Sequence, residues 1–413
     1  MTPRSLVLAT LLTATVPLAG CGGAPVTRLL EDQSARARLA TIRGDVALEE
    51  PSGAPIVVAL LRVPEHPQGP LQIVDFQILA SAGPFWFYAP AARYRVIAFE
   101  DTDRDQAYDV TERLGAWDGF ADLVAAEGST SEAHVQITGG APGPLPTVAM
   151  PSADVRSLHI GDVVPLEDAR FAQETGARGM WEPLAFMEEL GAGLFLVEPH
   201  VAGRTPVVLV HGMTGYPQEF RHIVASLDRS RFEPWLVQYP SGWELTAVAD
   251  YLSRALVELA QGLAVEGVCV VAHSMGGVVS RRALRFLDER QAGQLVRGFV
   301  TLASPLGGIP SAAAGMRFSP IHVPSWDNLV PDGAFMGAQY ERPLVPTIDY
   351  TLLFAFDGHS AGDGVVPLTS QLRAEAQAEA AHLHGFHTTH VGILEDEGAL
   401  RAIGEALERC VAR

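Results

Sequence analysis

Three residue types that together perform nucleophilic catalysis stand in separate stretches of the C-terminal half of the chain. Ser274 interrupts the apolar run VCVVAHSMGGVVS (268–280), and a pair of glycines follows it closely. Asp363 lies in GDGVVP, and several histidines crowd HLHGFHTTHVGIL (382–394). A serine hydroxyl becomes a nucleophile when a histidine takes its proton and a carboxylate orients that histidine. The sequence therefore predicts an acyl-transfer site in the order serine, acid, histidine.

The acid and the histidine each have competitors nearby. Asp357, in FDGH, competes with Asp363, and we favour Asp363 because the acid should lie on a loop beyond its strand. The clustered histidines could also be drawn as a zinc site, since such sites need three or four nearby ligands. That alternative leaves Ser274 and Asp363 without a role.

The elements that must position these residues read as alternating strands and helices. Continuous apolar runs are typical of strands buried on both faces, as in parallel sheets. They occur at Thr205–Val210, Trp235–Tyr239, Val268–Ala272, Gly298–Ala303 and Tyr350–Phe356. Apolar residues between 245 and 263 step by three and four, which indicates one helix. The pattern predicts an α/β doubly wound, mostly parallel sheet with Ser274 at its C-terminal edge, before a helix whose free N–H groups face a developing oxyanion.

The strand, turn and helix around Ser274 resemble the nucleophile elbow of α/β-hydrolases, with Ala272 where glycine is usual. From about Trp181 onward, the motifs VVLVHG, VQYPSGWEL, AHSMGG, TLASPLGG and PSWDNLVPDGAFM are similar to a bacterial lipase/esterase branch with GPI inositol-deacylase-like relatives. The resemblance implies an oxyanion hole from the main-chain N–H groups of Met213 and Met275. It also implies Asp363 as the acid and His390 as the base, with His387 as the alternative.

The resemblance implies a serine hydrolase that cleaves esters of lipids or other hydrophobic acyl groups without a cofactor. The segment 309–345 would help form a cap near the acyl pocket; the alternative is a packed connection that does not touch substrate. Three other functions stay open. They are an acyltransferase using the same triad, a peptidase, and a non-catalytic surface-binding lipoprotein.

The N-terminus reads as an export signal, with Arg4 before a short apolar run. That run ends in LAGC, which resembles the lipobox of bacterial lipoproteins and implies lipidation of Cys21; the alternative is an ordinary signal peptide. Gly22 stands where the inner-membrane retention signal of such lipoproteins usually has aspartate, so the resemblance implies the outer membrane of the bacterial cell envelope. The net charge of −19 over 413 residues argues against a nucleic acid partner.

Cys269 lies inside the apolar run before Ser274, so we expect it to pack in the core and not to take part in chemistry. One disulfide with Cys410 is the alternative, although the spacing does not suggest it.

The predicted order of segments is a signal peptide and lipobox (1–21), a tether (22–35), a β-sandwich (36–150), a linker leading into the second domain (151–195) and the α/β-hydrolase domain (196–413). Residues 36–150 alternate in short runs separated by turn residues, which predicts a small antiparallel all-β sandwich. GGAPGPLP (139–146) closes it as a linker.

An acidic stretch of the predicted sandwich has the spacing of a calcium loop. In DTDRDQAYDVTE the acidic residues fall at positions 1, 3, 5, 9 and 12: Asp101, Asp103, Asp105, Asp109 and Glu112. Gln106 stands where an EF-hand has glycine, and a strand precedes the loop, so we expect a calcium loop grafted on a sandwich. Similar loops occur in prealbumin-like and carboxypeptidase-regulatory-like domains. The ion would be structural; the alternative is a solvated acidic turn.

Overall fold

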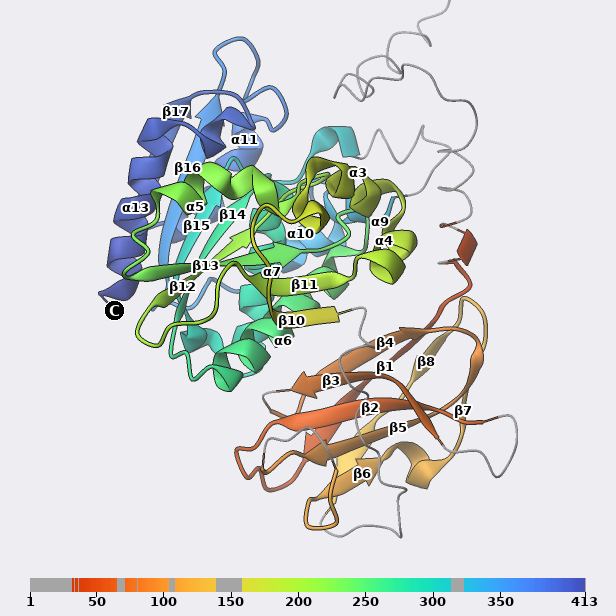
Figure 1. Cartoon of the computed structure of the whole chain (residues 1–413). Coiled ribbons are helices and arrows are strands. Elements are labelled where there is room, and N and C mark those ends of the chain that lie inside the picture. Colours follow the sequence, from red (N-terminus) through yellow and green to blue (C-terminus); the bar gives the residue numbers. More distant parts are fainter. Residues whose placement is uncertain are drawn as a thin grey trace, which may run out of the picture.

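The computed structural model describes residues 32, 34–35, 37–64, 71–79, 81–103, 108–138, 158–312 and 323–412. The predicted signal peptide, Cys21, Asp105 and the linker at 139–146 lie outside these residues, as does 313–322 of the predicted cap. The chain forms a strand-rich N-terminal part and a larger part in which helices cover a sheet (Figure 1).

The N-terminal part consists of two sheets. One has the order β4-β1-β8, with β9 also paired to β1, and the other has the order β3-β2-β5-β6, with β7 paired to β5. Their bounds are β1 Ala40–Leu48, β2 Ile56–Arg62, β3 Gln72–Leu79, β4 Pro84–Ala89, β5 Ala92–Glu100, β6 Leu114–Ala116, β7 Leu123–Ala125, β8 Thr130–Glu132 and β9 Val135–Ile137. Alternate residues of both sheets, such as Ile42, Val58, Phe87 and Val96, share one buried core. This arrangement is the all-β sandwich that the short alternating runs predicted.

The pairing differs from the expected antiparallel sandwich at β1. This strand runs parallel to β8 and to β9, whereas the remaining pairs in both sheets are antiparallel among the described residues. Strands β8 and β9 have three residues each, too short for alternation to reveal how they pair.

The second part is built on an eight-stranded sheet with the order β10-β11-β13-β12-β14-β15-β16-β17. All its pairs are parallel except β11 with β13. The strands are β10 Leu158–Val163, β11 Ala192–Leu196, β12 Thr205–Val210, β13 Phe232–Gln238, β14 Val268–His273, β15 Val296–Leu302, β16 Asp349–Phe356 and β17 His382–His387. The helices are α3 Gln173–Trp181, α4 Pro183–Glu189, α5 Arg221–Ser226, α6 Leu245–Gly262, α7 Met275–Glu289, α9 Pro324–Asn328, α10 Ala334–Ala338, α11 Leu368–Gln371, α12 Ala374–Glu379 and α13 Glu397–Val411.

Each face of this sheet has its own buried core, because alternate strand residues point to opposite sides. Val208 and Val210 of β12 pack with residues of α6 and α7, while Val207 and Leu209 pack with residues of α5 and α13. Figure 1 shows these helices on the two sides of the sheet. The strands are therefore buried on both faces, as their continuous apolar sequences predicted.

The segment 151–195, which we predicted to be a linker, belongs to the second part from residue 158 onward. It supplies β10 and β11, with α3 and α4 between them. Both strands are short, and the glycine and aspartate in LHIGDV hide any strand pattern. Among the described residues, no helix is both long and apolar enough to cross a membrane.

The two parts touch through aromatic side chains. Trp86 of β4 lies against Phe286 of α7, with ring centroids 5.9 Å apart, and Tyr88 meets Trp243 edge to face at 6.1 Å. Asp32, upstream of the sandwich, accepts hydrogen bonds from the N–H groups at the start of α4. The sandwich and Asp32 therefore contact helices of the second part.

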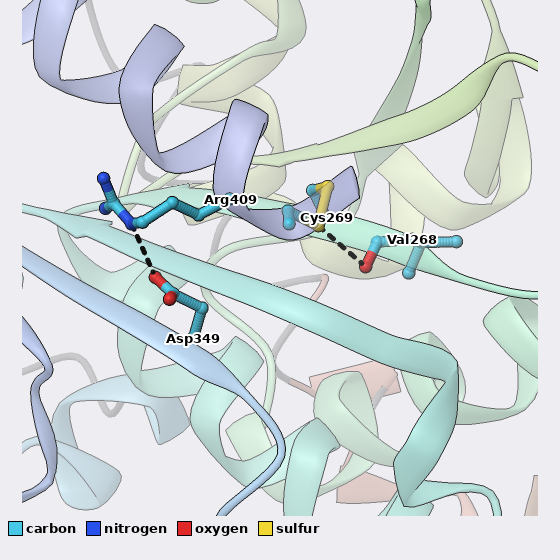
Figure 2. The surroundings of a disulfide bond; sticks show 5 residues. Val268, Cys269, Asp349 and Arg409 are labelled. Atoms are coloured by element: carbon cyan, nitrogen blue, oxygen red, sulfur yellow. Dashed lines mark hydrogen bonds and ion pairs between the residues drawn. A yellow bond between two sulfur atoms is a disulfide. The ribbon is translucent and has the colours of Figure 1, made fainter. Parts of the chain in front are cut away.

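A disulfide joins Cys269, in the middle of the sheet, to Cys410 at the end of α13 (Figure 2). The alternative that the spacing did not favour is therefore the one that the structure shows, and Cys269 does more than pack in the core. The two residues are 141 positions apart, yet their Cα atoms lie 6.2 Å apart because α13 packs across β14 and β15. Beside the disulfide, Arg409 pairs with Asp349 of β16, so the last helix is tied to the sheet at two neighbouring points.

Candidate active site

Ser274 occupies the tight turn between β14 and α7, and its main chain has φ 54° and ψ −130°. A non-glycine residue with positive φ is strained, and such residues gather at functional turns. The turn also requires glycine nearby, because a Cβ on Gly276 would lie 2.2 Å from the carbonyl oxygen of Val210 in β12. The local structure thus holds Ser274 at the C-terminal end of the central strand.

The structure joins Asp363, His390 and Ser274 in a chain of two hydrogen bonds. His390 Nε2 lies 2.9 Å from Ser274 Oγ, and its Nδ1 lies 2.7 Å from Asp363 Oδ2. All three residues are buried, with 7%, 1% and 8% of the surface of Ser274, Asp363 and His390 exposed. The competing residues lie elsewhere: His387 is exposed at the end of β17, and the Asp357 carboxylate binds the main chain of its own loop.

The Asp363 carboxylate is fixed by several donors. Oδ1 accepts the N–H groups of Val365 and Val366, and Oδ2 accepts Gln371 Nε2 as well as His390. Because this carboxylate accepts, the network assigns the proton of neutral His390 to Nδ1. Its Nε2 is then free to accept the Ser274 hydroxyl proton.

Burial lowers the pKa of His390, and the hydrogen bond that its Nδ1 donates to Asp363 offsets part of that effect. The nearby His273 lowers the pKa further. The imidazole is therefore mostly neutral at neutral pH, which is the form in which a general base works.

The loop after β12 lies directly against Ser274. A Cβ on Gly212 would fall 3.1 Å from Ser274 Oγ, so the main chain just before Met213 passes close to the Ser274 side chain. The loop is held by hydrogen bonds from Thr214 N to Ser241 Oγ and from Gly215 N to Gly212 O. Met275 is the first residue of α7, where main-chain N–H groups have no partner within the helix. Both proposed oxyanion donors thus belong to segments that flank Ser274.

His211 stabilises the loop after β12 through contacts with Gly212 and Tyr239. Its Nδ1 donates to the Gly212 carbonyl, its ring stacks on Tyr239 with centroids 4.3 Å apart, and the Tyr239 hydroxyl donates to the His211 carbonyl. Burial lowers the pKa of His211, so its ring is neutral. These contacts give His211 a place in the support of the loop.

Several residues near the site have partners that the sequence did not reveal. Gln371 anchors Asp363, and His273 pairs with Glu219, which lies in the short helical turn Pro217–Phe220. Glu219 and His273 are 54 positions apart in the sequence, so nothing in the sequence indicated that they would meet. Only the fold brings them together.

Of the four predicted ligands that the structure describes, the acidic loop brings three together. Carboxylate oxygens of Asp101, Asp103 and Glu112 lie within 4.8 Å of one another, whereas Asp109 is turned toward Thr111. Burial raises the pKa of Glu112, and the charge of Asp101 adds to this effect. Within the described part of the chain, the clustered histidines of 382–390 form no comparable group.

The described residues of the predicted cap pack against the sheet and α6. Leu329, Phe335, Met336 and Leu344 are buried in the same core as α6 and α7. Asn328 accepts the N–H of Leu245 and donates to Glu244 at the start of α6. These contacts place residues 323–344 over the C-terminal side of the sheet, and substrate contact stays a prediction.

Residues 207–401 match the sequence model of the alpha/beta hydrolase family. Similar solved structures include a lipase of Bacillus licheniformis in mature form, with 18% identity, TM-score 0.42, and 52% of this chain and 97% of that chain covered. Lipase B of Aspergillus fumigatus has 18% identity, TM-score 0.40, and covers 50% of this chain and 53% of its own. Naproxen esterase of Bacillus subtilis has 14% identity, TM-score 0.33, and coverages of 53% and 90%.

No curated protein sequence matches the chain. The family match falls on strands β12 to β17, the same strands that carry the mostly parallel sheet and the turn at Ser274. This part of the chain therefore has the α/β-hydrolase fold.

Proposed function

We propose that the protein is a serine hydrolase that cleaves carboxylic esters through an acyl-enzyme on Ser274. The observation that carries the proposal is the line of hydrogen bonds from Asp363 through His390 to Ser274 Oγ at a strained strand-to-helix turn. The alpha/beta hydrolase family match supports a hydrolase.

In the proposed mechanism, Ser274 Oγ attacks the ester carbonyl carbon while His390 Nε2 takes the hydroxyl proton. Asp363 keeps the other ring proton on Nδ1 and stabilises the imidazolium. The N–H groups of Met213 and Met275 hold the oxyanion of the tetrahedral intermediate. His390 then returns its proton to the departing alcohol. A water molecule attacks the acyl-enzyme by the same steps in reverse and releases the acid.

The proposed substrates are esters of lipids or other hydrophobic acyl groups. The apolar composition of the segment 309–345 supports this class, because pockets for acyl groups are lined mainly by apolar side chains. A series of p-nitrophenyl esters from short to long acyl chains tests it. Preference for long chains supports a lipid ester, and preference for the shortest chain contradicts the proposed substrate class.

Added glycerol distinguishes a hydrolase from an acyltransferase. A glyceride product in place of free acid would show that the acyl group passes to an alcohol.

The proposed location is the bacterial cell envelope, with a lipid on Cys21. The Cys269–Cys410 disulfide is compatible with an exported protein, since disulfides persist in oxidising compartments. Cys21→Ser should release a protein that still hydrolyses soluble esters. Retention of that variant in the membrane fraction would contradict the lipid anchor.

We also propose a structural calcium ion in the sandwich, held by Asp101, Asp103 and Glu112. The side chains of this loop fit calcium, because carboxylate oxygens are the ligands that calcium prefers. Three carboxylates converge in this partly buried loop. Calcium should raise the melting temperature of the protein, and Glu112→Gln should remove that effect. An equal melting temperature with calcium and with chelator would contradict the proposal.

A further inference from the structure

A buried pair of ionisable side chains stands directly behind the proposed base. His273 Nδ1 lies 3.1 Å from Glu219 Oε1, and only 5% and 9% of the His273 and Glu219 side chains are exposed. The other ring nitrogen, Nε2, lies 3.0 Å from the main-chain carbonyl oxygen of His390. The rings of His273 and His390 are 4.9 Å apart between centroids.

The partners of His273 indicate where its protons are. A carbonyl oxygen only accepts, so His273 Nε2 donates a proton to His390 O. Glu219 Oε2 accepts the N–H of Tyr216, which is the bond expected of a carboxylate. Burial raises the pKa of Glu219, yet His273, His211 and the Tyr216 N–H together leave that pKa below its usual range. A carboxylate only accepts, so the geometry leaves Nδ1 as the donor of the bond to Glu219 Oε1.

We propose that Glu219 and His273 form a buried ion pair that positions His390 through its main chain and sets a positive charge beside its ring, so that the base stays neutral at lower pH. The proposal rests on the proposed function, in which His390 is the base. Both residues are positioning residues, because neither contacts Ser274 Oγ or the reacting atoms in the proposed mechanism.

Asp363, Glu219 and His273 are the charged groups that shift the pKa of His390. Asp363 raises the pKa of His390, Glu219 raises it less, and the charge of His273 lowers it more than Glu219 raises it. His211, which also faces the pair, is neutral because burial lowers its pKa. Two phenols near Glu219, those of Tyr216 and Tyr239, have raised pKa values through burial and stay uncharged. The net effect of the pair is thus to favour the neutral base.

Glu219→Gln tests the charge while sparing the hydrogen bond to the His390 main chain. A lone buried charge is costly, so His273 should lose its Nδ1 proton and accept from the glutamine amide, still donating through Nε2. The acidic limb of the kcat/KM profile should then move to higher pH by about one unit. The loss of activity therefore grows as the pH falls. A loss that is equal at every pH, or a limb that moves to lower pH, would overturn the proposal.

Glu233→Gln is the matched control, because Glu233 is also a buried carboxylate paired with a histidine, the half-buried His200, at 2.6 Å. Glu233 lies in β13 near the N-terminal edge of the sheet, away from Ser274. This variant should lose stability as Glu219→Gln does, while its acidic limb stays where it is in the wild type.

A second measurement does not depend on turnover. In ¹⁵N-histidine-labelled wild type at neutral pH, His273 should show protons on both ring nitrogens, with His273→Asn giving the assignment. Glu219→Gln should show a neutral ring at this position. A neutral His273 in the wild type overturns the ion pair. An intact imidazolium signal in a protein that hydrolyses no ester would instead contradict the proposed function alone.

Discussion

Replacing Gly276 with alanine tests whether the turn at Ser274 depends on close contact between α7 and β12. The new Cβ would lie 2.2 Å from the Val210 carbonyl oxygen, whereas ordinary contact begins at 3.4 Å, so the two must separate by about 1.2 Å. The obstacle is main chain, not a side chain that can rotate. We expect overpacking to cost about 1–3 kcal/mol of unfolding free energy. Because a displacement near 1 Å moves Ser274 against its partners, kcat/KM should fall about 100-fold.

Gly404→Ala is the matched control, since it makes the same change in a helix with open space around it. Gly404 is exposed within α13, and no atom lies within 4 Å of its ideal Cβ position. There alanine should stabilise the protein by about 0.5–1 kcal/mol and leave kcat/KM unchanged. Urea unfolding and ester hydrolysis measure both variants side by side. If Gly276→Ala is as stable and as active as Gly404→Ala, the close-contact account of the turn is refuted.

Three further predictions concern the disulfide, the base and the acid. Replacing Cys269 and Cys410 together with alanine should lower the unfolding free energy by about 2–5 kcal/mol and abolish its sensitivity to reductant; equal stability of oxidised and reduced wild type would contradict this. The activity requires neutral His390, whose pKa is lowered by burial, so kcat/KM should fall as the pH drops through a value below about 6.5; a midpoint well above that value would contradict it. Asp363→Asn should lower kcat by about 10³–10⁴-fold while Asp357→Asn leaves it unchanged, and similar rates in both would remove Asp363 from the account.

Local patterns predicted the elements of the α/β part well. The run Thr205–Val210 is β12 to the residue, and the apolar stripe from 245 to 263 corresponds to α6 at Leu245–Gly262. A strand buried on both faces and a helix with one apolar side each carry their signal in neighbouring residues. Ser274 and Asp363 each follow a predicted strand, β14 and β16, whereas the strand before His390, β17, was not predicted and His390 was chosen from the resemblance.

Two contacts between residues far apart in the sequence could not be predicted. Cys269 and Cys410 meet because α13 packs across the sheet, and Glu219 reaches His273 because the turn after β12 folds beside β14. In both cases the sequence separation carried no information about the distance in space. Strand β10, by contrast, escaped notice because its glycine and aspartate obscure a short pattern.

The central claim is that Ser274 is the nucleophile, and covalent labelling tests it most directly. A serine-directed fluorophosphonate should attach to one site in the wild type, and mass spectrometry of the digest should place the adduct on Ser274. The Ser274→Ala variant, with unchanged unfolding free energy, should take up no label and turn over no ester. Normal turnover in Ser274→Ala, or an adduct on another residue with Ser274 unmodified, would contradict the account.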